Sequence, residues 1–194
     1  SFQKKHTHSF RVIPNIRKSN SPKKDAIDTA LKVSRSEWIV TTDGDCEMPK
    51  NWLRLIDSYI QENKCNMIVA PVAYKADKSF LQQFQWIDFL SLQAATVGGF
   101  GIKRPFLCNG ANFAYRSTFE NVQGFKNNNS IASGDDIFLL EKFIRYNQQQ
   151  VHYLKSNEAI ITTYPTESVN ELIHQRVRWA SKTSNYTLFF GKII

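Results

Sequence analysis

The sequence predicts an α/β fold, with a mostly parallel central sheet flanked by helices. Short apolar segments alternate along the chain with segments whose apolar residues recur at helical spacing. Acidic residues directly follow the apolar segment 38–40, and Pro49 stands where the first turn of the next helix is expected. Because ligands bind at the carboxyl ends of parallel strands, we expect a functional site directly after residue 40.

The expected elements follow in chain order. The strands are apolar or alternating segments bounded by turn residues: 10–13, 38–40, 67–74, the end of 106–115, 151–155 and 159–163. The helices have apolar residues at a spacing of 3.6: 25–33, 49–60, 80–97, 135–146 and 168–181. Ser168 and Glu171 form a capping box at the start of the last helix, and Asn109 to Ala111 form a tight turn.

Length and composition predict one domain. The 194 residues are 42% hydrophobic, enough for one core, and no repeat divides residues 1–194. The three cysteines form no C-x-x-C pair, so we expect a reducing compartment and no disulfide framework. No apolar stretch is long enough to cross a bilayer. The sequence begins without a methionine and ends in apolar residues, which suggests a segment of a larger protein.

The net charge of +8 indicates an anionic partner. A nucleotide diphosphate, a membrane surface and a nucleic acid all fit this charge. The helix expected at 80–97 has apolar residues on more than one face. It fits either a buried core helix or a helix that packs against a membrane or another segment.

Asp43 and Asp45 are the candidate metal ligands. They follow an apolar strand, so their carboxylates emerge from the core, although Asp-Gly-Asp is also a common turn sequence. Mg²⁺ or Mn²⁺ takes one or two protein carboxylates and completes its shell with water and substrate phosphate. Asp45 is the preferred ligand, and Asp43 either binds a ribose or reaches the metal through water.

Asp135 and Asp136 stand at the start of an expected helix, after Ser133 and Gly134. In that position both could simply favour the helix dipole. Gly134 would also let a ligand approach the backbone, so that one aspartate acts as a base toward an acceptor hydroxyl while the other caps the helix.

Gln175, Arg178 and Trp179 fall within one sector of about 100° on their helix. We expect Ile173, Val177 and Ala180 to form the opposite, core-facing side, with Arg176 directed away from Arg178. The guanidinium of Arg178 suits a pyrophosphate and the indole of Trp179 suits a sugar, although a solvated Arg and Gln beside a core Trp is an equally simple interpretation. Lys23 could contact phosphate, or could be solvated together with Lys24.

At these residues the chain resembles the family 2 inverting glycosyltransferases, whose catalytic domain has the GT-A fold. The resemblance covers residues 23–181. Its motifs are Lys23-x-x-Ala26, Asp43-Gly44-Asp45, Phe106 to Gly110, Gly134-Asp135-Asp136, and a Gln-x-x-Arg-Trp signature at 175–179 that is similar to membrane-bound synthases. The first strands of the family, which bind the nucleobase, are not identifiable here.

The resemblance implies a metal-dependent, inverting transfer of a sugar from a nucleotide diphosphate, expected to be uridine-linked, to a hydroxyl of a lipid or polysaccharide. It selects Asp136 as the catalytic base. The implied donor-binding residues are Lys23, Asp43, Gln175 and Arg178, and the implied acceptor-binding residues are Asn109, Gly110, Asp135 and Trp179. It also implies a domain at the cytoplasmic face of a membrane, with its anchor outside this segment.

Two other functions would also fit the acidic residues or the basic charge of the chain. A nucleotidyltransferase can also use an aspartate pair and a metal, and would release pyrophosphate. A nucleic-acid-binding module would fit the basic charge, but the lysines and arginines are scattered and no basic-aromatic motif stands out, so we expect no nucleic-acid partner.

Overall fold

The structure is a computed structural model that describes residues 11–19, 21–75, 79–117, 135–183 and 188. Its helices are α1 (Pro22–Val33), α2 (Trp52–Glu62), α3 (Phe80–Gly101), α4 (Asp135–Asn147) and α5 (Val169–Thr183). Its strands are β1 (Trp38–Thr41), β2 (Met67–Val69), β3 (Val72–Tyr74), β4 (Phe113–Arg116), β5 (Val151–Tyr153) and β6 (Ile161–Thr163). Two short 3₁₀ helices, η3 (Gln148–Gln150) and η4 (Asn157–Ala159), precede β5 and β6.

The four-stranded sheet has the order β1-β4-β2-β5, and β3 pairs with β6 in a separate two-stranded sheet. β2 and β5 are parallel, and β4 is antiparallel to both of its neighbours, so β1, β2 and β5 run in one direction. β3 and β6 are also parallel. The expected α/β class is confirmed, with β4 as the strand that makes the central sheet mixed.

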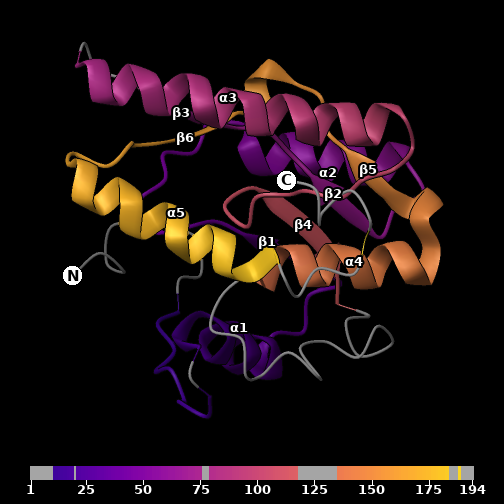
Figure 1. The fold of residues 1–194 in the computed structure, drawn as a ribbon. Helices are drawn as coiled ribbons and strands as arrows, with labels where there is room; N and C mark the ends of the chain where they lie inside the picture. The colour runs from indigo at the N-terminus through magenta and orange to yellow at the C-terminus, as the bar shows by residue number, and fades with distance from the viewer. Residues whose placement is uncertain (1–10, 20, 76–78, 118–134, 184–187, 189–194) are drawn as a thin grey trace.

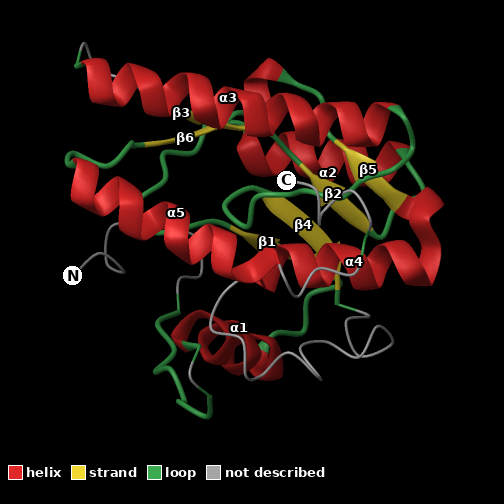
Figure 2. Cartoon of the chain, viewed as in Figure 1, coloured by secondary structure: helices red, strands yellow, loops and turns green. Residues whose placement is uncertain are grey.

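The central sheet lies between helices (Figures 1 and 2). Successive residues of a strand point to opposite faces. Met67 and Val69 of β2 therefore pack with Leu140 and Phe143 of α4, whereas Ile68 packs on the other face with α2. α3 covers β3 through a further cluster that includes Tyr74 and Phe89. These helices hold the central sheet in place and thereby fix the position of the carboxyl end of β1.

Most expected elements are present, with ends shifted by up to four residues. Pro49 lies before α2, which begins at Trp52, so its expected place in the first turn of that helix is wrong. Two expected strands differ in kind. Residues 11–13 are irregular, so the expected strand at 10–13 is wrong for its described part. The segment 67–74 is interrupted at Ala70 and Pro71, and its two halves join different sheets. Among the described residues, no helix is long and apolar enough to cross a membrane.

Candidate active site

The carboxyl end of β1 carries the acidic turn predicted from the sequence. β1 ends at Thr41, whose hydroxyl donates a hydrogen bond of 2.9 Å to the carbonyl oxygen of Gly110. Asp43 and Asp45 follow, the first half-buried and the second exposed. The hydroxyl of Thr41 therefore connects the acidic turn to the loop that precedes β4.

This loop reaches the site because β4 is antiparallel. Thr41 pairs with Phe113, so the start of β4 lies beside the end of β1. The tight turn expected at Asn109 to Ala111 is present: the amide of Asn112 donates to the Asn109 carbonyl, and the amide of Ala111 donates to the Asn109 side-chain oxygen. Asn109 thus shapes the turn that presents Gly110.

Helix α1 supplies Lys23. Ser21 caps the helix by accepting a hydrogen bond from the amide of Lys24, and Pro22 occupies its first turn. Lys23 Nζ lies 2.5 Å from Asp43 Oδ1, in an ion pair between two partly exposed side chains. Lys24 is buried and lies over the ring of Phe138, so the two lysines are not a solvated pair.

Helix α4 brings Asp136 to the same place. The amide of Gly110 donates to Asp136 Oδ2 at 3.0 Å, and the amide of Ile137 donates to Asp136 Oδ1 at 2.9 Å. A Cβ atom at Gly110 would lie 3.4 Å from Asp136 Oδ2 and 3.5 Å from Lys23 Nζ. Lys23, Asp43, Gly110 and Asp136 therefore form one group, which we call the Lys23–Asp136 cluster. The side chain of Asp135, and all of Ser133 and Gly134, lie outside the described residues.

Asp45 stands at the edge of the turn. Its Oδ2 atom lies 3.4 Å from the hydroxyl of Thr163. The two residues meet because the neighbouring Glu47 pairs with Thr162. Burial raises the pKa of the neighbouring Cys46 thiol, and the charges of Asp45 and Asp43 raise it further.

The described part of the chain contains no group of three or more His, Cys, Asp or Glu side chains that could hold a metal ion. Two carboxylates nevertheless fit Mg²⁺ or Mn²⁺, which take remaining ligands from water and phosphate.

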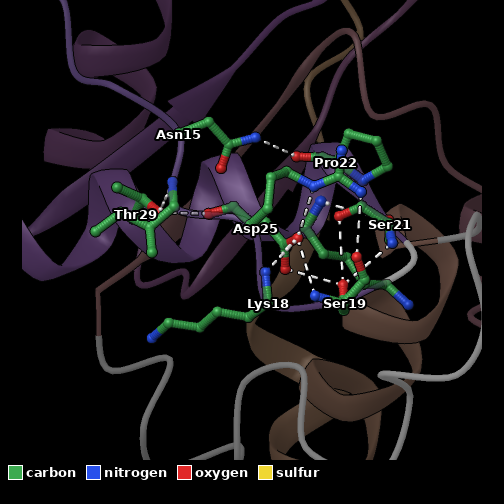
Figure 3. Close-up of polar contacts among 10 residues, drawn as sticks. Asn15, Lys18, Ser19, Ser21, Pro22, Asp25 and Thr29 are labelled. Atoms are coloured by element: carbon green, nitrogen blue, oxygen red, sulfur yellow. Dashed lines mark hydrogen bonds and ion pairs between the residues drawn. The ribbon is translucent and has the colours of Figure 1, made fainter.

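A second network, which no sequence pattern indicates, fixes the start of α1 (Figure 3). The buried carboxylate of Asp25 accepts hydrogen bonds from the amides of Lys18 and Ser19, from the Ser19 hydroxyl and from Arg17 Nε. These bonds, led by the Lys18 amide, lower the pKa of Asp25 to about 2. Asp25 thereby holds the preceding loop on the helix turn that carries Lys23.

Helix α5 begins as the sequence predicts. The amide of Glu171 donates to the Ser168 hydroxyl, and the amide of Ser168 donates to the Glu171 carboxylate. This reciprocal pair is the expected capping box.

The faces of α5 differ from the prediction. Leu172 is buried and Gln175, Arg176 and Trp179 are half-buried, whereas Ile173 and Val177 are exposed. Arg176 forms an ion pair with Asp88 of α3 and lies over the ring of Trp179. The expected core face at Ile173 and Val177 is therefore wrong, because α5 packs against α3 through the side that carries Arg176. Arg178 is exposed.

Trp179 connects α5 to the rest of the site. It packs against the apolar cluster of Val72, Tyr74, Phe89 and Ala111, as does Cys46 of the acidic turn. Ala111 directly follows Gly110 of the Lys23–Asp136 cluster. The structure therefore brings Lys23, Asp43, Gly110 and Asp136 into contact and places Trp179 beside them, while Arg178 remains on the outer side of α5.

The first part of the chain is similar to a known protein family. The family model of glycosyl transferase family 2 matches residues 2–124, which include the acidic turn and Gly110. A crystal structure described as that of a mycobacterial protein is 17% identical, with a TM-score of 0.44. The alignment covers 82% of this chain and 48% of that one, so the chain spans about half of its length. No curated protein matches the chain.

Proposed function

This chain belongs to glycosyl transferase family 2, and on that premise we propose that it forms a single catalytic domain, residues 1–194, that transfers a sugar from a uridine diphosphate donor to an acceptor hydroxyl. The transfer inverts the anomeric carbon and depends on Mg²⁺ or Mn²⁺. The observation that carries the proposal is the Lys23–Asp136 cluster, in which a cation, a strand-end carboxylate and a candidate base meet.

Asp136 acts as the base in this proposal. The acceptor oxygen attacks the anomeric carbon, the bond from that carbon to the diphosphate oxygen breaks, and the acceptor proton passes to Asp136. Each carboxylate oxygen of Asp136 accepts one amide hydrogen bond, from Gly110 or Ile137. Because a carboxylate oxygen has two lone pairs, one remains free of these amides to receive the proton. The two amides fix the direction of that lone pair.

Asp45 and Asp43 would hold the metal, which supplies positive charge to the departing diphosphate. Lys23 contributes a second positive charge on the Asp43 side. Arg178 and Gln175 are the remaining candidates for donor binding. Asn109, Gly110 and Trp179 are the candidates for acceptor binding, together with Asp135, whose side chain lies outside the described residues. Arg178 is exposed on the outer side of α5, so a bidentate contact of its guanidinium with pyrophosphate stays a prediction from the sequence.

The decisive variant is Asp136→Asn. We expect the metal-dependent release of uridine diphosphate to fall at least about a hundredfold, because the amide cannot accept the proton. Asp57→Asn, an exposed carboxylate on α2, is the matched control and should retain activity. Nucleotide release is measured with a panel of uridine-linked sugars and Mn²⁺, with product masses as a second readout. Full activity of Asp136→Asn would remove Asp136 from the mechanism, and release of pyrophosphate would indicate a nucleotidyltransferase.

We also propose that the domain works at the cytoplasmic face of a membrane. Phe80, Phe84 and Ile87 recur along α3 and are exposed, Phe80 by 87%. On α5, Val169, Ile173 and Val177 form a second exposed apolar row. The ion pair between Arg176 and Asp88 makes the two helices neighbours (Figure 1). Apolar helix faces on a chain with a net charge of +8 suit an anionic lipid surface.

Sedimentation with phosphatidylserine vesicles tests this proposal. The pair of changes Ile87→Ser and Ile173→Ser should weaken vesicle binding about tenfold, since each removes apolar area from the contact. Leu53→Ser changes an equally exposed side chain on α2 and should have little effect. If the unchanged protein stays in the supernatant with these vesicles at low salt, the membrane proposal is wrong.

A further inference from the structure

β6 brings the hydroxyl of Thr163 to the acidic turn, and the proposed reaction assigns this hydroxyl no role. It lies 3.4 Å from Asp45 Oδ2 and 3.5 Å from the Asp45 carbonyl oxygen. Because an ionised carboxylate only accepts hydrogen bonds, Thr163 is the donor of this pair. Both distances are long for a hydroxyl donor, so a small rotation of the Asp45 side chain is enough to shorten the contact with Oδ2.

The main chain is held on both sides of this contact. Thr163 ends the parallel pairing of β6 with β3, and its carbonyl accepts a hydrogen bond of 2.8 Å from the amide of Lys75. Two residues after Asp45, Glu47 and Thr162 exchange two backbone hydrogen bonds, of 2.7 and 3.0 Å. Because both main chains are held, the freedom left to Asp45 is the rotation of its side chain.

The two candidate metal ligands differ in what holds their carboxylates. Asp43 is paired with Lys23 at 2.5 Å. Asp45 is exposed and forms no ion pair with any described residue. Its Oδ2 atom contacts the Thr163 hydroxyl, and its Oδ1 atom lies 3.9 Å from the Cys46 thiol. A thiol is a weak donor, so the hydroxyl of Thr163 has the larger influence on the direction of the Asp45 carboxylate.

Carboxylates that bind a metal are commonly held by a hydrogen bond from a further residue, and loss of such a partner typically weakens metal binding about 10–100-fold. We propose that Thr163 is a positioning residue: its hydroxyl donates to Asp45 Oδ2 and directs the remaining carboxylate lone pairs toward Mg²⁺ or Mn²⁺. Thr163 acts through Asp45 and contacts neither the sugar nor the diphosphate. The inference rests on the proposed metal-dependent transfer, and it adds a residue of the β3–β6 sheet to the candidate active site.

Mn²⁺ binding by the whole protein tests this role without turnover. Electron paramagnetic resonance measures free Mn²⁺ in the presence of uridine diphosphate, and a titration without protein corrects for Mn²⁺ held by the nucleotide. Thr163→Val keeps the branched shape but loses the hydroxyl, and should raise the Mn²⁺ dissociation constant about tenfold. Thr163→Ser keeps the hydroxyl and should restore most of the affinity. Thr162→Val is the matched control, because successive strand residues point to opposite faces, and should leave the affinity unchanged.

The rate of release of uridine diphosphate gives a readout that a merely structural role would not move. In Thr163→Val, the Mn²⁺ concentration for half-maximal release should rise about tenfold, whereas saturating Mn²⁺ should restore the maximal rate. Thermal unfolding without Mn²⁺ checks that the Val and Ser variants are as stable as the unchanged protein.

The outcomes separate this inference from the proposed function. Equal Mn²⁺ dissociation constants for Thr163→Val and the unchanged protein would overturn the positioning role, as would equal losses of affinity in Thr163→Val and Thr162→Val. A loss of rate that saturating Mn²⁺ does not restore would also overturn it, because Thr163 would then act on the reaction itself. In each of these cases, metal-dependent release of uridine diphosphate that requires Asp136 would leave the proposed function standing.

Two further results concern the metal itself. Absence of Mn²⁺ binding by the unchanged protein would overturn both the positioning role and the metal dependence of the proposed reaction. Mn²⁺ binding that depends on the Thr163 hydroxyl, without release of uridine diphosphate from any sugar donor, would contradict the proposed function alone.

Discussion

Asp25 makes the folded state of α1 sensitive to acid. Its carboxylate accepts bonds from Lys18, Ser19 and Arg17, and its pKa falls to about 2 from the ordinary value of 3.8. A carboxyl group with a lowered pKa in the folded state stabilises the protein above its unfolded pKa. This contribution is lost as the pH falls from about 4 toward 2.

We therefore predict that Asp25→Asn lowers the urea midpoint at pH 7, and that the difference from the unchanged protein shrinks between pH 4 and pH 2. The amide cannot accept the same set of charge-assisted bonds. Urea unfolding at each pH measures the effect, with Asp57→Asn as the control. A difference in urea midpoint that stays constant between pH 4 and pH 2 would show that the charge of the Asp25 carboxylate is unimportant for stability.

At the scale of one helix, the adjacent glycines of α3 give a matched pair. A Cβ atom at Gly99 would lie 2.8 Å from the Phe106 ring and 3.1 Å from the Arg104 carbonyl, whereas one at Gly98 would meet nothing within 4 Å. Gly99→Ala should destabilise the protein by about 1–3 kcal/mol through overpacking. Gly98→Ala should stabilise it by up to about 1 kcal/mol through helix propensity. Thermal unfolding of both variants checks the prediction, and equal effects would contradict the packing of Phe106 on α3.

The elements also show what the sequence can predict. Helical spacing and the caps located all five described helices to within a few residues, because each helix has a clear apolar periodicity or a start signal. The face of α5 could not be predicted in this way. Ile173 and Val177 look like core residues, but the ion pair of Arg176 with Asp88 depends on a partner on α3, far away in the sequence.

The direction of β4 is the second feature beyond the reach of the sequence. Apolar residues at 113–115 predict a strand but carry no sign of its direction. The acidic turn after β1 was predictable from local sequence alone, whereas its contact with Gly110 required the antiparallel pairing of Thr41 with Phe113. The candidate site was thus predictable in its parts and not in its assembly.

At the scale of the whole molecule, Asn112 joins the two sheets to α2. Its side-chain nitrogen donates to the carbonyls of Pro71 and Ala159, and its oxygen accepts from Trp52 Nε1 at 2.9 Å. Asn112→Ala would leave two buried groups, Trp52 Nε1 and the Ala159 carbonyl, without this partner, while the Pro71 carbonyl still accepts from the Ile161 amide. The change should cost at least about 2–3 kcal/mol. Asn51→Ala, at a helix start without a side-chain cap bond, is the control. Denaturant unfolding measures the free energy of unfolding of both variants. A smaller loss of this free energy for Asn112→Ala than for Asn51→Ala would contradict the role of Asn112 in joining the sheets to α2.

The pairing of Thr41 with Phe113 restricts where the chain can change its length. Gly110 precedes β4 by a fixed number of residues, and its amide binds Asp136. One residue inserted between Gly110 and Phe113 would move that amide by up to about 3.8 Å, the distance between successive Cα atoms, beyond reach of the carboxylate. An insertion next to the exposed residues 102–104, which follow the end of α3, would leave the pairing of Thr41 with Phe113 and the spacing after Gly110 unchanged. Relatives that preserve this chemistry should therefore tolerate length variation before Gly110 and keep the spacing after it constant.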